Sequence, residues 1–405
     1  MIASPRVALV LGGGGLKGFA HVGVLRALTE RGIFPTVYAG TSIGALIAAA
    51  RAGGMEWHEM ARRAESLRRR DLFRVNHVGM LVDRLKVPSF YLEEPLRFLC
   101  ESVAPPGKFH ELPVRLLVNT VDLAHGTQVV WGLPGLQDVR VADAVYASCA
   151  LPGAFPPGVV DGRICVDGGV VDNLPAAIAG IGTDYVIAVD VGSSDLTHEK
   201  EIASQGFFSI YMRAATTMMH TLQQQPLTAW QGPPMLLIRP RVSHVGWFDF
   251  QHTAELIDAG YRAAEEAFDH LDTVRTAPGG VFPRRSVRVV VDHGKCTGCG
   301  ICVALAPNVM GLDSRRKAYA LTHVLDWSPA DGDFVNHCPT RAISIERVDS
   351  RRGLPILEQE AEGEIPGPPD VPPPTGALEV ARAMEEQPVN APPLQPPTPG
   401  KKVAS

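Results

Sequence analysis

The sequence predicts an α/β fold, because an apolar strand pattern followed by a short turn and a helical pattern occurs twice near its N-terminus. Residues 7–11 form one apolar run, and residues 17–31 carry apolar side chains at helical spacing until Gly32. Residues 36–39 form a second β-prone run, which small helix-forming residues follow from 43 to 50. A cysteine-rich stretch near residue 300 and a proline-rich C-terminal segment indicate two further parts of the chain.

The first turn is rich in glycine, with Gly13, Gly14 and Gly15 between the predicted strand and helix. A strand, a glycine loop and a helix in this order present backbone N–H groups to an anion. The spacing of Gly13, Gly15 and Gly18 also matches the dinucleotide fingerprint, which expects an acidic residue at the end of the next strand. That strand ends in Ala-Gly-Thr-Ser instead, so the sequence favours an oxyanion hole over a nucleotide phosphate site.

Ser42 lies at the second turn, in the pentapeptide Gly-Thr-Ser-Ile-Gly at residues 40–44. A nucleophile on a sharp strand-to-helix turn has a strained backbone and crowds the positions two residues before and after it. Gly40 and Gly44 occupy both positions, and the helix that follows favours negative charge near Ser42. A chance match in a glycine-rich chain is the alternative, and the preceding glycine loop favours the nucleophile.

Asp167 is the candidate general base, because the apolar run 164–166 delivers it to the end of a predicted strand. Gly168 and Gly169 follow it and allow a neighbouring loop to approach closely. Asp-Gly is also a favoured turn dipeptide, but Asp161 and the glycine after it fit that hairpin better. The sequence therefore predicts a Ser-Asp dyad.

A histidine base is the alternative to the dyad, since α/β-hydrolases place their triad in the order Ser, acid, His. Four histidines follow Asp167 in the sequence: His198, His220, His244 and His252. None of them is flanked by glycine or ends a strand pattern, and the oxyanion loop of that fold lies much further before its serine. The sequence favours the dyad as the simpler arrangement.

Three of these blocks together resemble the signature blocks of the patatin-like phospholipases: residues 13–18, 40–44 and 167–169. Further segments resemble the bacterial branch of that family: residues 21–25, 147–157 and 172–175. The resemblance extends over roughly residues 5–270.

This resemblance implies a three-layer α/β/α fold and the hydrolysis of acyl esters in phospholipids or other lipids. It implies that Ser42 attacks the acyl carbonyl and that Asp167 accepts the serine proton. It also implies that the loop Gly13, Gly14 and Gly15 forms the oxyanion hole, with the N–H groups of the last two as donors. This chemistry requires no metal.

Three cysteines at two-residue spacing, Cys296, Cys299 and Cys302, lie near residue 300, and Cys338 precedes a proline further on. Three thiolates on one short loop can wrap one face of an iron–sulfur cluster, whereas tetrahedral zinc is usually bound by two separate pairs. In two-cluster proteins a fourth cysteine of the run ligates the other cluster, but Ala306 holds that position here. The count predicts one [4Fe-4S] cluster, with zinc, a three-iron cluster and a ligand-free remnant as alternatives.

Three β-prone runs flank these cysteines at residues 287–291, 318–321 and 342–346, and the whole of residues 286–348 resembles a single-cluster ferredoxin domain. The resemblance implies a small α+β domain that transfers electrons or senses redox state, with a redox protein as its partner. The other cysteines lie among apolar neighbours and are expected in the core: Cys100, Cys149 and Cys165.

The two resemblances and the composition together divide the chain into an acyl hydrolase domain at 5–272, a linker at 273–285, the ferredoxin-like domain at 286–348 and a disordered proline-rich tail at 349–405. With 405 residues, of which 45% are hydrophobic, the chain is long enough for more than one core. The net charge of -5 gives no electrostatic reason to expect nucleic acid as a partner.

No apolar run is long enough to span a bilayer, and the N-terminus lacks the basic region of a signal peptide. Unpaired cysteines and an oxygen-sensitive cluster predict a cytoplasmic location. A basic helical segment is a candidate for peripheral contact with the inner face of the membrane, although a solvated helix face is the favoured interpretation: Arg62, Arg63, Arg68, Arg69, Arg70 and Arg74. A further group lines an acyl channel or packs in the core: Phe207, Phe208, Met212, Met218 and Met219.

The sequence thus predicts an acyl hydrolase with an attached redox module. One alternative is a ferredoxin-type electron-transfer protein whose patatin-like part anchors it to a lipid or a protein. The intact Ser42, Asp167 and glycine loop favour the hydrolase, since an anchor has no need of all three. Another alternative is transfer of the acyl group to an acceptor other than water, which the same dyad can perform.

Overall fold

The computed structural model describes residues 5–75, 89–192, 206–247 and 249–348. They form two compact units. Of the described residues, the first unit holds those up to Arg284 together with Ser328–Asp331, and the second holds Arg285–Trp327 and those from Gly332 to residue 348. The predicted disordered tail, 349–405, lies outside the described residues.

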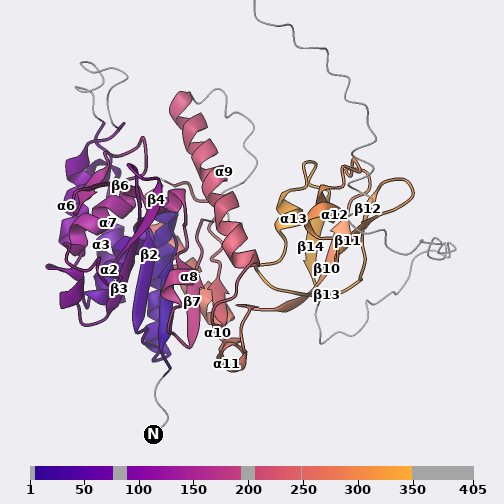
Figure 1. Ribbon diagram of the computed structural model, residues 1–405, viewed down its shortest axis with the longest axis horizontal. Helices are drawn as coiled ribbons and strands as arrows, with labels where there is room; N and C mark the ends of the chain where they lie inside the picture. The colour runs from indigo at the N-terminus through magenta and orange to yellow at the C-terminus, as the bar shows by residue number, and fades with distance from the viewer. Residues whose placement is uncertain (1–4, 76–88, 193–205, 248, 349–405) are drawn as a thin grey trace, which may run out of the picture. The chain divides into compact units, whose positions relative to one another are not determined.

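A sheet of nine strands, counted over the described residues, forms the centre of the first unit (Figure 1). The strands follow the order β5-β6-β3-β2-β1-β7-β8-β9, and β4 pairs with β3. The parallel strands are β1 (Val7–Leu11), β2 (Val37–Thr41), β3 (Arg115–Asp122), β7 (Tyr185–Val189), β8 (Met235–Ile238) and β9 (Val281–Phe282). The antiparallel strands are β4 (Thr127–Trp131), β5 (Gly158–Val160) and β6 (Arg163–Asp167).

The strand order places a topological switch at β1. The chain leaves β1 toward β2 on one side and later adds β7 on the other side. Crevices outside the carboxyl ends of parallel strands at such a switch are where open α/β sheets bind ligands. The loops after β1 and β2 open at this place.

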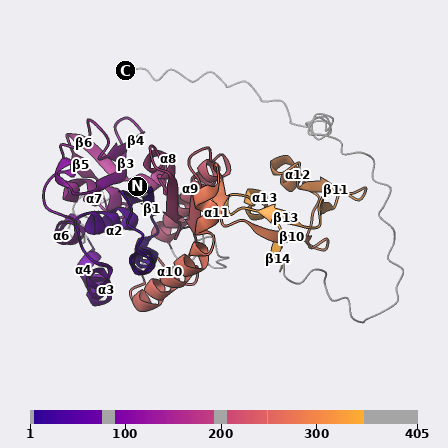
Figure 2. The same cartoon turned by 90° about the horizontal axis from the view of Figure 1, so that it is seen from below.

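Helices cover both faces of the sheet, which confirms the three-layer α/β/α fold predicted from the sequence. Alternate strand residues separate the layers, since Leu9 and Leu11 face one side while Ala8 and Val10 face the other. The first side is covered by α1 (Ala20–Glu30), α2 (Ile43–Ala52), α3 (Trp57–Ser66), α6 (Glu93–Val103), α7 (Val141–Cys149) and α10 (Thr253–Phe268). The second side is covered by α8 (Ala176–Ala179) and by the C-terminal end of α9 (Phe207–Thr228). Figure 2 shows α3 and α10 on the opposite side of the sheet from α8.

Most of the predicted elements of the first unit are confirmed. The predicted strands became β1 and β2, and the predicted helix 17–31 begins as the 3-10 helix η1 (Gly15–Phe19) and continues as α1. Asp161 and Gly162 form the predicted hairpin turn between β5 and β6, both with positive φ, 49° and 73°. The basic segment forms two helices, α3 and the short α4 (Arg69–Leu72), rather than one.

The stretch 273–285, expected as a linker, is structured instead. It holds the end of α11 (Leu271–Thr276) and the strand β9, which pairs in parallel with β8. Its proline and glycine residues form the turn into β9, where the Met235 N–H donates to the Gly280 carbonyl over 2.9 Å. The unpaired edge of β8 explains the difference, because an exposed edge strand is satisfied by pairing with any nearby extended segment.

The second unit is a small α+β fold. Strand β10 (Arg285–Val291) lies between β13 (Leu325–Trp327) and β14 (Ile343–Arg347) in an antiparallel sheet. The other elements are β11 (Met310–Leu312), β12 (Ala318–Ala320), α12 (Ile301–Leu305) and α13 (Asp333–Asn336). A core of its own, which includes Val289, Cys302 and Phe334, holds these elements together. Among the described residues of both units, no helix is both long and apolar enough to cross a bilayer.

Candidate active site and cysteine cluster

Ser42 lies between the end of β2 and the start of α2, on a turn with a strained backbone. Its φ is 56° and its ψ is -128°, a region that residues with a Cβ atom rarely adopt. The Ser42 side chain lies close enough to the Asp167 carboxylate to lower the pKa of that carboxyl. The structure therefore brings the two predicted catalytic residues together at the carboxyl ends of their strands.

Two glycines permit this turn. A Cβ atom at Gly40 would lie 2.4 Å from the carbonyl carbon of Gly44, and a Cβ atom at Gly44 would lie 2.0 Å from the carbonyl oxygen of Leu11. Any other residue at these positions would push β1, β2 and α2 apart. Gly18 also has no space for a side chain, because a Cβ atom there would lie 2.2 Å from the Ile43 Cγ2 atom.

The glycine loop after β1 lies directly beside Ser42. A Cβ atom at Gly13 would lie 3.2 Å from the Ser42 Cβ atom, and the Gly13 N–H donates to the Asn173 carbonyl over 3.3 Å. Within the part of the chain that the structure describes, Gly14 and Gly15 donate to no backbone carbonyl. Gly15 has a φ of 58°, a left-handed conformation that glycine adopts without strain. The two N–H groups after Gly13 are thus the ones available to an oxyanion, whereas that of Gly13 is engaged.

A buried histidine holds the start of this loop. The His21 Nε2 donates to the Gly12 carbonyl over 2.8 Å, because a carbonyl oxygen only accepts. Burial lowers the pKa of His21 to about 4, although the Gly12 carbonyl and Asp190 oppose this change. The imidazole is therefore neutral near pH 7 and serves as a fixed donor. No role for His21 was predicted from the sequence, where its position early in the helical pattern after the loop is the one signal.

Asp167 ends β6 and is almost completely buried, with 2% of its surface exposed. Burial raises the pKa of Asp167 to about 6, while the hydrogen bond from the Gly169 N–H and the nearby Ser42 hydroxyl favour the ionised form. The Gly169 N–H lies 2.8 Å from the Asp167 Oδ1 atom. A carboxylate with this pKa is ionised at neutral pH and is a stronger base than an exposed aspartate, as general base catalysis requires.

A second, buried serine fixes the backbone of Ser42. The Ser42 N–H donates to Ser148 Oγ over 2.9 Å, and the Ser148 hydroxyl donates to the Asn119 carbonyl over 2.7 Å. The Asn119 side chain also donates to Thr41 Oγ1 over 3.2 Å and to the Asp172 carbonyl over 2.6 Å. This network ties β2, β3, α7 and the loop after Asp167 into one site. The sequence did not predict it, because its members are far apart in the chain.

Helix α9 packs against the loops that hold Gly169 and Asn173. The Asn173 Nδ2 atom donates to the Gly13 carbonyl over 3.0 Å and to the Gln223 Oε1 atom of α9 over 3.2 Å. A Cβ atom at Gly169 would lie 2.4 Å from the Cε atom of Met219, which is buried. Met218 is exposed. The side chains of Phe207, Phe208 and Met212, expected in the same group, lie outside the described residues.

The histidines weighed as alternative bases lie elsewhere or outside the described residues. The His244 Nε2 and Glu255 Oε1 atoms form a hydrogen bond over 2.6 Å, and the His252 Nδ1 and Asp249 Oδ2 atoms form another over 3.0 Å. Both pairs lie at the surface, with side chains at least 32% exposed. His198 and the side chain of His220 are not among the described residues.

The four predicted ligand cysteines line one pocket in the second unit: Cys296, Cys299, Cys302 and Cys338. Two of their sulfur atoms accept backbone N–H groups, since Ala318 donates to Cys296 over 3.5 Å and Ala342 donates to Cys338 over 3.2 Å. Glycines with φ of 72° and 79° between the first cysteines let the loop turn around this pocket.

The donor set fits an iron–sulfur cluster. Burial opposes ionisation of Cys338, but hydrogen bonds led by the Ala342 N–H outweigh it and lower the pKa of the thiol. Burial raises the pKa of Cys302. Backbone N–H donors to cysteine sulfurs are among the features that set cluster potentials. Among the described residues, no three His, Cys, Asp or Glu side chains are already arranged to hold a metal ion, so the fit rests on the four thiols around one pocket.

Family models match both units. Residues 9–179 match the patatin-like phospholipase family, and residues 289–367 match the 4Fe-4S single cluster domain. The chain therefore carries a patatin-like phospholipase domain and a 4Fe-4S single cluster domain.

The curated proteins similar to this chain include an NTE family protein and a lysophospholipase named nte1. An uncharacterized NTE family protein of Mycobacterium tuberculosis is 37% identical over 48% of this chain and 51% of its own length. Lysophospholipase nte1 of Neosartorya fischeri is 28% identical over 67% of this chain and 19% of its own length. The chain thus spans about half the length of the first of these relatives, and far less of the second. Among solved structures, VipD of Legionella pneumophila is 16% identical, with a TM-score of 0.36 over 66% of this chain and 67% of that chain.

Proposed function

We propose that this chain, which carries a patatin-like phospholipase domain, hydrolyses the acyl ester bonds of lipids, as a phospholipase A or lysophospholipase does. The observation that carries the proposal is the position of Ser42, on a strained turn, beside the buried Asp167, whose pKa burial raises to about 6. The family match and the lysophospholipase among the similar proteins support lipid esters as the substrate class.

In the proposed reaction, Ser42 Oγ attacks the acyl carbonyl carbon while the Asp167 carboxylate takes the hydroxyl proton. The N–H groups of Gly14 and Gly15 donate to the oxyanion of the tetrahedral intermediate. Asp167 then gives its proton to the leaving alcohol, and the acyl group remains on Ser42. Water attacks this acyl-enzyme with Asp167 again as base, which releases the fatty acid and restores the serine.

The experiment that tests this function is an assay of anaerobically purified protein against a panel of acyl esters, with lysophospholipids, phospholipids and nitrophenyl esters as substrates. We expect release of free fatty acid from at least one lipid substrate. Formation of a new acyl ester with an added alcohol, in place of fatty acid, would instead support the acyltransferase. Absence of both products in protein with a full iron content would contradict the proposal and favour the electron-transfer alternative.

We further propose that the four cysteines of the second unit hold one [4Fe-4S] cluster, which transfers electrons to a redox protein or senses redox state. The pocket that these cysteines share and the N–H donors to Cys296 and Cys338 support it. Bound there, the cluster would supply one-electron redox chemistry, which ester hydrolysis does not use. We propose a cytoplasmic location with peripheral contact at the inner membrane face, where a lipid substrate is available.

Replacing a predicted ligand tests whether the cluster controls the ester site. We expect Cys299→Ser to lower the iron content and to destabilise residues 286–348, yet to leave the esterase rate constant within about threefold of wild type. Typical allosteric coupling begins at about fivefold, and each unit has a hydrophobic core of its own. Iron analysis, visible absorption and the ester assay on one preparation measure this. A large, reversible change in esterase rate when dithionite reduces the wild-type protein would show redox control instead.

A further inference from the structure

Asn173 holds both polar groups of the Gly13 backbone. The Gly13 N–H donates to the Asn173 carbonyl over 3.3 Å, and the Asn173 Nδ2 atom donates to the Gly13 carbonyl over 3.0 Å. Because a carbonyl oxygen only accepts, the nitrogen end of the side-chain amide must face it. Asn173 follows Asp167 by six residues, so the loop after the candidate base anchors the glycine loop at two points.

The carbonyl of Gly13 and the N–H of Gly14 belong to one peptide unit. This peptide is trans, so the two groups point in opposite directions, and a donor that fixes the carbonyl also fixes the direction of the N–H. The Gly14 N–H is one of the two that we propose to bind the oxyanion. Glycine lies on both sides of this peptide and restricts its rotation least of all residues. Contacts from elsewhere in the fold must therefore hold it in place.

The hydrogen bond between the Asn173 amide and the Gly13 carbonyl is shielded from water. Asn173 is 4% exposed, and Gln223 of α9, whose Oε1 atom accepts from the same Nδ2 atom over 3.2 Å, is 3% exposed. A Cβ atom at Gly192 would lie 3.0 Å from the Nδ2 atom and 3.1 Å from the Gly13 oxygen, so the backbone there covers the bond. Among the described residues, the Asn173 Oδ1 atom has no hydrogen-bond partner. The two bonds from its nitrogen therefore set the orientation of the amide, and the low local dielectric strengthens them.

We propose that Asn173 is a positioning residue that aims the Gly14 N–H at the oxyanion of the ester reaction, an inference that rests on the proposed function. When Ser42 Oγ bonds to the acyl carbon, the hydroxyl proton passes to Asp167 and one electron pair of the carbonyl double bond moves onto its oxygen. The Gly14 N–H stabilises this negative charge only if it already points there. Asn173 acts through the peptide that it holds and not through contact with the substrate.

The test is Asn173→Leu, which has a side chain of similar size without a donor. We expect kcat/KM for the best nitrophenyl ester to fall about 10²-fold, the size of the loss when one oxyanion donor is removed. An alkyl trifluoromethyl ketone forms the same kind of oxyanion when Ser42 adds to it, so its inhibition constant should rise by a similar factor. The secondary alcohol with the same carbon skeleton forms no oxyanion, and its inhibition constant should stay within about threefold of wild type. A merely structural role of Asn173 would weaken both inhibitors alike.

Gln223→Leu is a second variant, in case Asn173→Leu fails to fold. It removes the α9 acceptor that supports the Asn173 amide and leaves the bond to the Gly13 carbonyl. We therefore expect a smaller effect of the same kind, with kcat/KM lowered at least about threefold and the ketone weakened more than the alcohol.

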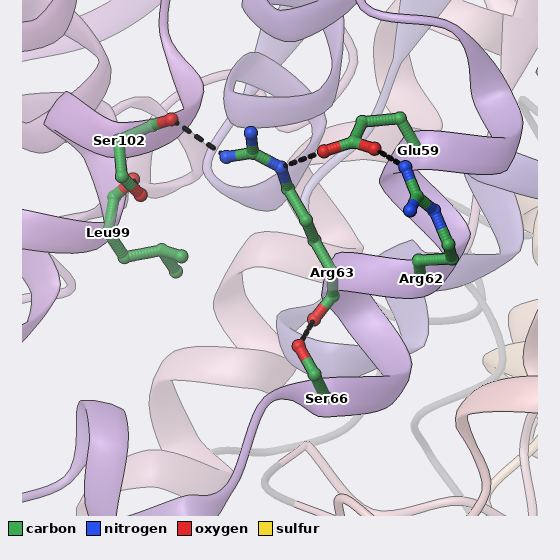
Figure 3. A network of polar contacts seen from close by, with 6 residues as sticks. All are labelled: Glu59, Arg62, Arg63, Ser66, Leu99 and Ser102. Atoms are coloured by element: carbon green, nitrogen blue, oxygen red, sulfur yellow. Dashed lines mark hydrogen bonds and ion pairs between the residues drawn. The ribbon is translucent and has the colours of Figure 1, made fainter.

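Arg63→Leu is the matched control, because Arg63 also donates to a backbone carbonyl, but away from the glycine loop. Its guanidinium donates to the Ser102 carbonyl over 2.9 Å and to Glu59 over 2.7 Å, between α3 and α6. Figure 3 shows the Arg63 guanidinium between these two groups. Loss of these bonds should leave kcat/KM and inhibition by the ketone within about twofold of wild type.

The role of Asn173 and the proposed function can fail separately. If wild type hydrolyses esters but folded Asn173→Leu keeps kcat/KM within about threefold, or weakens ketone and alcohol alike, the positioning role is contradicted and the hydrolase stands. If wild type hydrolyses no ester, the proposed function fails, and crystal structures of wild type and Asn173→Leu still test what holds the Gly13–Gly14 peptide. A peptide that turns in the variant supports the role of Asn173, and a peptide that keeps its wild-type orientation contradicts it.

Discussion

Replacing Ser42 by alanine is expected to reduce ester hydrolysis by at least about 10⁴-fold, because the nucleophile that forms the acyl-enzyme is lost; removal of a catalytic serine has effects of this size or larger. The serine lies in the first unit and the four cysteines in the second. We therefore expect the visible absorption of the cluster to remain unchanged. Steady-state assays with the best ester of the panel, together with absorption spectra, measure both effects.

Ser314→Ala is the matched control for this substitution, since Ser314 is exposed and lies in the second unit. It should keep wild-type activity within about twofold. Retained turnover in a pure Ser42→Ala sample, with a melting curve like that of wild type, would remove Ser42 from the mechanism.

Replacing Asp167 by asparagine is expected to lower kcat by roughly 10⁴-fold, since the amide can hold the Ser42 hydroxyl but cannot accept its proton. His244→Ala is the comparison, because His244 pairs with Glu255 at the surface, and it should have little effect. A loss in His244→Ala as large as the loss in Asp167→Asn would indicate a triad.

Asp167 also predicts how kcat/KM and the stability of the fold depend on pH. Burial raises the pKa of Asp167 to about 6, so wild-type kcat/KM should fall about tenfold per pH unit below that value. The folded pKa lies above the unfolded value, so the protonated carboxyl stabilises the fold below about pH 3.8, and this contribution is lost as the pH rises through 6. Asp167→Asn should therefore be more stable than wild type at pH 8, by up to roughly 3 kcal/mol. Thermal melts at pH 4 and pH 8 measure this, and equal shifts at both pH values would contradict it.

The local part of the site could be predicted from the sequence because short-range sterics dictate it. A strand that turns into a helix within one residue leaves no space for a Cβ atom at Gly40 or Gly44. The two glycines of the pentapeptide therefore predict the turn. The cysteine spacing predicted the shared pocket of the second unit for the same reason, since a loop of seven residues confines its three thiols.

The supporting residues could not be predicted, because only the tertiary fold brings them to the site. Ser148 is 106 residues from the Ser42 N–H that it accepts, and Asn173 is 160 residues from the Gly13 carbonyl. Nothing in their local sequence indicates these partners. The hydrogen bond from the Gly13 N–H to the Asn173 carbonyl depends on the same long-range contact.

The apparent linker illustrates another limit of local patterns. Proline and glycine at 278–280 are typical of a loop, and they do form one, but the two residues that follow add a strand to the main sheet. Two residues are too few for a periodic pattern, so only the free edge of β8 decides their structure. The basic segment gave a similar result, since its helical spacing did not reveal the break between α3 and α4.

The most direct test of the central claim, that Ser42 is a nucleophile activated within this site, is to locate a covalent adduct. Wild-type protein is incubated with a long-chain alkyl fluorophosphonate, which phosphonylates activated serines with release of fluoride, and is then digested for mass spectrometry. The account predicts one adduct per chain, on the peptide that contains Ser42, formed in step with loss of esterase activity and strongly slowed in Asp167→Asn. An adduct on another serine, or full esterase activity in protein fully labelled at Ser42, would contradict it.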